Sequence, residues 1–245
     1  MVRTQRQIST LALFLLIPGL TGAAACRQAP AAAPPTAVAA PARPASPAPA
    51  AERQPSGPLV VFLGDSLTAG LGLAEDQAYP ARVAARLAAR GTPVRVINAG
   101  VSGDTSAGGL ARLDWLLGQR PDILVLALGA NDGLRGLPLA DTEKNLREII
   151  RRSRATGARV LLLGMQIPPN YGPDYAGGFK AMYPRIAKDL NVPLVPFLLE
   201  GVGGIAGLNQ ADGIHPTAEG QEKVAGNVAP LLEKLLAEEA TTARK

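Results

Sequence analysis

Three residues of this sequence have side chains that could together cleave an acyl ester. His215 is the only histidine, so no other residue could supply an imidazole base. Asp212 lies three residues earlier, close enough to orient the ring and to stabilise its protonated form. Ser66, which follows Gly64 and Asp65, has a hydroxyl that such a base could activate. We therefore take Ser66, His215 and Asp212 as the candidate nucleophile, base and orienting acid.

Each of these residues also has a simpler explanation. A serine after a strand can serve only as the cap of the next helix, and a lone histidine can lack any chemical task. A helix cap, however, does not require further polar turns, and this sequence has three of them, at residues 98–106, 129–133 and 212–216. We therefore favour the catalytic interpretation.

Short apolar runs alternate with longer amphipathic segments, which predicts an α/β fold with a parallel sheet covered on both faces. The expected strands are Leu59–Leu63, Val94–Asn98, Ile123–Leu128, Val160–Gly164 and Leu194–Phe197. The expected helices are Tyr79–Arg90, Ala107–Gly118, Asp141–Ala155, about 177–190 and about 217–236. We expect Asp141 to cap its helix, and three helices to end at Gly91, Gly118 and Gly157. Right-handed crossovers in this three-layer α/β/α sandwich would bring the polar turns to one edge of the sheet.

The polar turns resemble the motifs of the Ser-Gly-Asn-His hydrolases, also called GDSL esterases. Gly-Asp-Ser-Leu at 64–67, Gly103, Asn131 and Asp-x-x-His at 212–215 occur in the order of that family. Longer blocks resemble its bacterial thioesterase/lysophospholipase/arylesterase branch over residues 58 to about 235: GDSLTAG, GVSGDTS, LGANDGLRGLP, MQIPPNYG, YPRIAKDLNVPLVPF and DGIHPTAEGQ. The Gly-x-Ser-x-Gly elbow of other esterases is absent. The resemblance implies a flavodoxin-like sandwich with five parallel strands, and hydrolysis of carboxylic esters or thioesters.

The resemblance also implies a role for each residue of the motifs. Ser66 would attack the acyl carbon, His215 would take its proton and return it to the leaving group, and Asp212 would orient His215. The backbone N–H groups of Ser66 and Gly103 and the side-chain amide of Asn131 would form the oxyanion hole. Gly103 would let the backbone approach the substrate without a Cβ in the way.

Two further loops, residues 133–137 and 167–172, are similar to the acyl-pocket loops of the family. Their candidate substrate contacts are Leu134, Arg135, Ile167 and Tyr171. The expected partner is a small-molecule acyl ester or thioester. We expect a monomer, with no cofactor and no metal.

Two other hypotheses compete with the esterase. Asp65, Asp104, Asp132 and Asp212 would all lie at one sheet edge, where carboxylates could bind Mg²⁺ in a metal-dependent hydrolase. We instead expect the first three to accept hydrogen bonds from turn amides. The chain could also be an inactive, tethered binding module, although none of the triad or oxyanion-hole residues is missing.

The N-terminal quarter of the chain differs in composition from the rest. Residues 1–25 combine two arginines, an apolar run and small residues, which is typical of a signal peptide. Cys26 follows three alanines and resembles the lipidated cysteine of bacterial lipoproteins; simple cleavage after Ala25 is the alternative. Residues 26–57 are rich in Ala and Pro, which predicts a disordered tether ahead of a hydrolase domain at 58–240. We therefore expect an exported protein, either periplasmic or anchored to a membrane through Cys26.

The charge of the chain argues against nucleic acid as a partner. The formal net charge is +5, but residues 1–55 hold five arginines and one acid. The remainder holds 20 basic and 19 acidic side chains, so the expected domain is nearly neutral.

Overall fold

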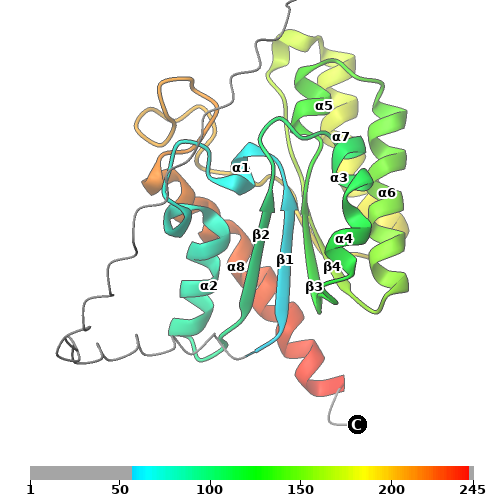
Figure 1. Ribbon diagram of the computed structural model, residues 1–245. Helices are drawn as coiled ribbons and strands as arrows, with labels where there is room; N and C mark the ends of the chain where they lie inside the picture. The colour runs from blue at the N-terminus through cyan, green and yellow to red at the C-terminus, as the bar shows by residue number, and fades with distance from the viewer. Residues whose placement is uncertain (1–56, 243–245) are drawn as a thin grey trace, which may run out of the picture. The chain divides into compact units, whose positions relative to one another are not determined.

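Five parallel strands form the central sheet of residues 57–242, the part of the chain that this computed structural model describes (Figure 1). The sheet order is β2-β1-β3-β4-β5. The strands are β1 (Leu59–Gly64), β2 (Arg95–Gly100), β3 (Ile123–Ala127), β4 (Arg159–Leu163) and β5 (Leu194–Val195). The predicted three-layer sandwich with a five-stranded parallel sheet is confirmed.

The strands differ in burial according to their place in the sheet. Every residue of β1 and β3 is buried, as a strand covered on both faces requires. Each buried Leu, Ile or Val contributes roughly 1.5–3 kcal/mol relative to an exposed one, so these two strands form the centre of the core. In β2, at the edge, only Ala99 is buried, so the expectation that every strand is fully covered was wrong for β2.

Helices cover the sheet on both sides (Figure 1). On one face α2 packs against α8, and on the other α6 packs against α3 and α7. The helices that cover the faces are α2 (Tyr79–Ala89), α3 (Ser106–Ala111), α4 (Leu113–Leu117), α6 (Leu139–Ala155), α7 (Pro173–Leu190) and α8 (Ala218–Thr242). Short elements follow the strands at their carboxyl ends: α1 (Ser66–Ala69), η1 (Glu75–Gln77), α5 (Ala130–Leu134) and η2 (Pro169–Tyr171).

Several expected element bounds were wrong for identifiable reasons. The helix expected at 107–118 is two helices that meet at Arg112, whose backbone (φ −100°, ψ 4°) leaves the helical range. The helix expected to begin at Asp141 starts at Leu139, directly after Pro138, so Asp141 lies in the first turn rather than at the cap. Strand β5 ends at Val195 because Pro196 has no N–H to continue the ladder.

The helix ends show where left-handed backbone is needed. Gly91 and Gly157 have φ of 81° and 93°, as a glycine directly after a helix should. Gly118 has φ −59°, and Arg120 takes the positive φ instead. The helix expected at about 177 begins at Pro173, and the last helix extends to Thr242.

The predicted signal peptide, Cys26 and the tether up to residue 56 lie outside the described residues. Among residues 57–242, no helix has both the length and the apolar character that a membrane span requires.

Candidate active site

Ser66 and His215 meet at the carboxyl edge of the sheet. Ser66 is the first residue of α1, directly after β1, and His215 lies in the loop before α8. His215 Nε2 is 2.8 Å from Ser66 Oγ, and the two residues are 149 positions apart in sequence. This distance is that of a hydrogen bond, as proton transfer between the two atoms requires.

Asp212 holds the imidazole ring on its other side. Its Oδ2 is 2.6 Å from His215 Nδ1, and its Oδ1 accepts the backbone N–H groups of Ile214 (2.9 Å) and His215 (3.0 Å). The hydrogen bond from the His215 backbone, followed by those from its ring and from Ile214, lowers the pKa of Asp212 to about 2. An ionised Asp212 accepts a hydrogen bond from the Nδ1–H group, which leaves Nε2 as the acceptor that faces the Ser66 hydroxyl.

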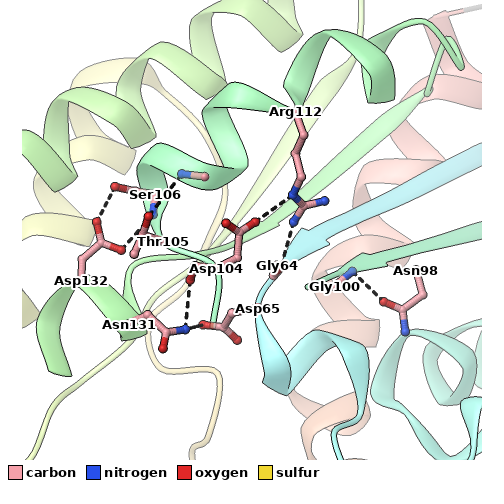
Figure 2. Close-up of polar contacts among 11 residues, drawn as sticks. Gly64, Asp65, Asn98, Gly100, Asp104, Thr105, Ser106, Arg112, Asn131 and Asp132 are labelled. Atoms are coloured by element: carbon pink, nitrogen blue, oxygen red, sulfur yellow. Dashed lines mark hydrogen bonds and ion pairs between the residues drawn. The ribbon is translucent and has the colours of Figure 1, made fainter. Parts of the chain in front are cut away.

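The three expected oxyanion donors line one pocket with His215. Gly103 has φ 80°, a left-handed angle that favours glycine. A Cβ at Gly103 would make only an ordinary contact with the guanidinium of Arg135, at 3.6 Å. The backbone angle, rather than a lack of space, is therefore what favours glycine here. Asn131 Nδ2 donates to the backbone oxygen of Asp104 at 2.9 Å and lies 3.5 Å from Asp65 Oδ2 (Figure 2). The first of these contacts fixes the direction of the Asn131 amide.

A network of buried and half-buried polar groups contacts the turns on either side of Asn131 (Figure 2). Asp132 accepts three hydrogen bonds: from the Ser106 N–H at 2.8 Å, from the Ser106 hydroxyl at 2.5 Å and from the Thr142 hydroxyl at 3.2 Å. Asp104 pairs with Arg112 at 2.8 Å, and Arg112 also donates to the Gly64 oxygen at 3.0 Å. The Arg112 guanidinium thus links the end of β1 to the turn that follows β2.

The four aspartates at this edge have separate partners. Asp65 accepts the N–H of Leu67 at 3.0 Å and Asp132 accepts that of Ser106, as expected, whereas Asp104 pairs with a guanidinium rather than a turn amide. Within residues 57–242, no three or more His, Cys, Asp or Glu side chains are grouped so as to hold a metal ion. The geometry therefore gives the Mg²⁺ hypothesis no ligand set.

Side chains from three other segments hold α1 in place. A helix of four residues is not stable by itself. Gln221 of α8 donates to the Leu67 oxygen at 3.1 Å and accepts the N–H of Tyr79 at 2.9 Å. Asn98 of β2 donates to the Thr68 oxygen at 2.9 Å, and the Thr68 hydroxyl lies 2.9 Å from that of Tyr79. Sequence reasoning assigned no role to Gln221 or Asn98, although both lie within or beside the motif blocks.

A pocket of about 710 Å³ opens beside Ser66. Of the four expected substrate contacts, Leu134 and Ile167 line it, while Arg135 donates to the Gly103 oxygen and Tyr171 donates to the Leu134 oxygen. Pro168 and Pro169, from the predicted loop at 167–172, line the pocket as well. Sequence reasoning missed one wall, which follows β4 and β5 and comprises Met165, Phe197, Leu199, Gly203 and Gly204. The available signal was the position of these residues after the last two strands, at the same edge as the other turns.

Comparisons with known proteins identify the family and the class of enzyme. Residues 62–223 match the model of the GDSL-like Lipase/Acylhydrolase family. The chain is 49% identical over 185 residues to "Esterase TesA" of Pseudomonas aeruginosa, covering 75% of this chain and 92% of that one. It is 41% identical to "Thioesterase 1/protease 1/lysophospholipase L1" of Escherichia coli K12, covering 72% and 84%. The crystal structure of the psychrotrophic esterase EstA from Pseudoalteromonas sp., inhibited by monoethylphosphonate, superposes with a TM-score of 0.69 at 35% identity, covering 73% and 98%.

The fold and its relatives define a serine hydrolase that acts on ester bonds. The chain belongs to the GDSL-like lipase/acylhydrolase family, also described as the Ser-Gly-Asn-His hydrolases.

Proposed function

We propose that Ser66, His215 and Asp212 are the catalytic triad of this esterase. The observation that carries the proposal is the hydrogen-bonded chain from Ser66 Oγ to His215 Nε2 and from His215 Nδ1 to Asp212. The lone histidine, the ionised Asp212 and a serine at the start of a helix support the same assignment.

The reaction has two symmetrical halves. Ser66 Oγ attacks the acyl carbon while His215 Nε2 takes its proton, and the carbonyl oxygen becomes an oxyanion. The intermediate then expels the alcohol or thiol, which receives the proton from His215, and the acyl group stays on Ser66. A water molecule repeats these steps and releases the carboxylic acid.

We propose that the oxyanion is held by the N–H groups of Ser66 and Gly103 and by the side-chain amide of Asn131. The common pocket of these three residues and the fixed Asn131 amide support this assignment. Because the hole is built before substrate arrives, its donors need no rearrangement during the reaction.

The pocket beside Ser66 suits an acyl chain. Its walls are mostly aliphatic and aromatic carbon, from residues such as Met165, Phe197 and Leu199. Named relatives are an arylesterase, an esterase and a thioesterase/lysophospholipase. We propose that the substrates are esters or thioesters whose acyl part fills this pocket, with Leu134 and Ile167 as contacts.

We further propose export, with a signal peptide at residues 1–25, a tether at 26–57 and a lipid on Cys26. The composition of this segment supports the proposal. The mass of the mature N-terminus in a bacterial host tests it. A diacylated Cys26 is expected, whereas an unmodified N-terminus at Cys26 would indicate simple cleavage.

Substitution of the nucleophile tests the triad directly. Ser66→Ala should abolish turnover of a short-chain p-nitrophenyl ester, while Ser102→Ala, a matched serine in the same pocket, should keep most of it. An organophosphonate should add its mass to the wild type and not to Ser66→Ala. Activity that survives in Ser66→Ala, or that a chelator removes while the phosphonate does not, would overturn the assignment.

A further inference from the structure

Most of the large exposed hydrophobic side chains of residues 57–242 either line the pocket beside Ser66 or lie within three residues of its lining. Six are more than a third exposed, and the only one on a helix that covers the sheet is Trp115, on α4. The other five are Leu71 (44%), Val101 (47%), Leu137 (37%), Ile205 (46%) and Ile214 (49%). Isolated exposed hydrophobic residues need no explanation, but five around one opening do.

These five residues, which we call the apolar rim, continue the lining of the pocket. Leu71 and Ile214 themselves line it. Val101, Leu137 and Ile205 lie one to three residues from the lining residues Ser102, Leu134 and Gly204. They come from four loops, because Ile205 and Ile214 share the long connection between β5 and α8. Apolar surface therefore extends from the site of ester cleavage to the outside of the protein.

Hydrogen bonds fix two of the loops that carry the rim. Gln210 Nε2 donates to the oxygens of Leu71 (2.7 Å) and Pro216 (3.0 Å), which joins the loops on either side of the pocket. Asn209 Nδ2 donates to the oxygens of Val202 (2.7 Å) and Ile205 (3.0 Å). The rim is thus a preformed surface.

Three of the segments that carry the rim are free of charged residues, namely 70–74, 101–103 and 201–209. Charged residues adjoin them, because Glu75 follows the first, Asp104 follows the second and Glu200 precedes the third. Arg135 and Asp212 are engaged with the Gly103 oxygen and with His215. Such a surface complements an assembly that is apolar inside and has no net surface charge.

We propose that the apolar rim docks on a zwitterionic lipid surface, from which the acyl chain of a substrate enters the pocket. The proposal rests on the proposed function, because it needs a pocket that takes acyl chains. A lipid surface is favoured over a protein partner because it can supply the pocket's own ligand, and because the rim offers almost no charged groups for a specific protein contact.

The test uses the chain from residue 26 onward with Cys26→Ser, so that neither the apolar signal segment nor a lipid on the protein contributes to binding. Co-sedimentation with phosphatidylcholine vesicles should show binding that varies little with NaCl concentration. The double variant Leu137→Ser/Ile205→Ser, whose residues do not line the pocket, should bind about tenfold more weakly, because two partly exposed side chains no longer enter the lipid. Trp115→Ser, which removes a larger exposed side chain outside the rim, is the matched control and should bind as the parent does.

Two activity measurements complete the test. The double variant should hydrolyse monomeric p-nitrophenyl acetate at the parent's rate and micellar lysophosphatidylcholine with about tenfold lower kcat/KM. Thermal unfolding identifies a folding defect, in which case the two single variants are measured instead. An active parent that does not bind vesicles, equal weakening by Trp115→Ser, binding only to anionic vesicles at low salt, or equal loss on both substrates would each overturn the rim proposal. Failure of the parent on every ester would overturn the proposed function instead.

Discussion

Asp65 is a buried acid whose removal should stabilise the protein. It is 2% exposed and lies between β1 and α1, where its Oδ1 accepts the N–H of Leu67 at 3.0 Å. Burial is the main cause that raises its pKa from 3.8 to about 6, against the opposing effect of the Leu67 hydrogen bond. The folded protein therefore binds a proton at Asp65 more readily than the unfolded chain does.

The sign and size of the effect follow from this difference in pKa. Above pH 6 the carboxylate is charged in both states, and its burial costs the folded state about 3 kcal/mol, at about 1.4 kcal/mol for each pKa unit. The cost falls as the pH drops from 6 to 3.8 and is absent below that range. Asparagine keeps an oxygen for the Leu67 N–H and carries no charge, and it gives up only the long 3.5 Å contact with Asn131 Nδ2. Asp65→Asn should therefore raise the free energy of unfolding by up to about 3 kcal/mol at pH 8 and leave it nearly unchanged at pH 3.5.

Urea unfolding followed by circular dichroism from pH 3.5 to 8 measures this difference. Asp132→Asn is the matched control, because Asp132 is equally buried but accepts hydrogen bonds from Ser106 and Thr142. The side-chain NH₂ of an asparagine at position 132 would face the N–H and hydroxyl donors of Ser106 and Thr142. Asp132→Asn should therefore lower the free energy of unfolding by roughly 1–3 kcal/mol at pH 8. Destabilisation by Asp65→Asn at pH 8, or a gain that does not change with pH, would refute the burial argument.

Three further substitutions probe the site. Asn131→Ala should lower kcat about 10²–10³-fold with little change in KM in steady-state assays, and an effect confined to KM would remove Asn131 from the oxyanion hole. Asp212→Ala should reduce kcat by about 10⁴-fold without a large shift in melting temperature, since Asp212 lies at the surface; near-normal turnover would contradict its orienting role. Gln221→Leu should lower both the free energy of unfolding, by roughly 1–3 kcal/mol, and kcat, because it releases the Leu67 oxygen behind Ser66; normal kcat in the folded variant would show that the contact is only structural.

The arrangement of the site was predictable from topology. Turns that follow parallel strands must meet at one edge, so Ser66, Gly103 and Asn131 could be placed together without knowing any side-chain contact. His215 lies in the long connection between β5 and α8, and the same rule brought its turn to that edge.

The remaining features could not be read from local pattern. The apolar residues after β5, such as Phe197 and Leu199, resemble core residues, and only the three-dimensional structure shows them facing a pocket. The break at Arg112 is a change in one residue's backbone that leaves the amphipathic pattern intact. Gln221 acts on Leu67 across 154 positions, a separation beyond the reach of any periodicity argument.

The long interval between nucleophile and base also affects when the enzyme can act. A growing polypeptide would contain Ser66, Gly103 and Asn131 well before His215, which is made 149 residues after the serine. Any fragment that stops before His215 lacks both the imidazole and the Gln221 side chain that holds α1. Ester cleavage therefore requires that the segment with His215 and α8 has been made and has packed beside α1. Incompletely synthesised copies should be inert toward the acyl groups they meet.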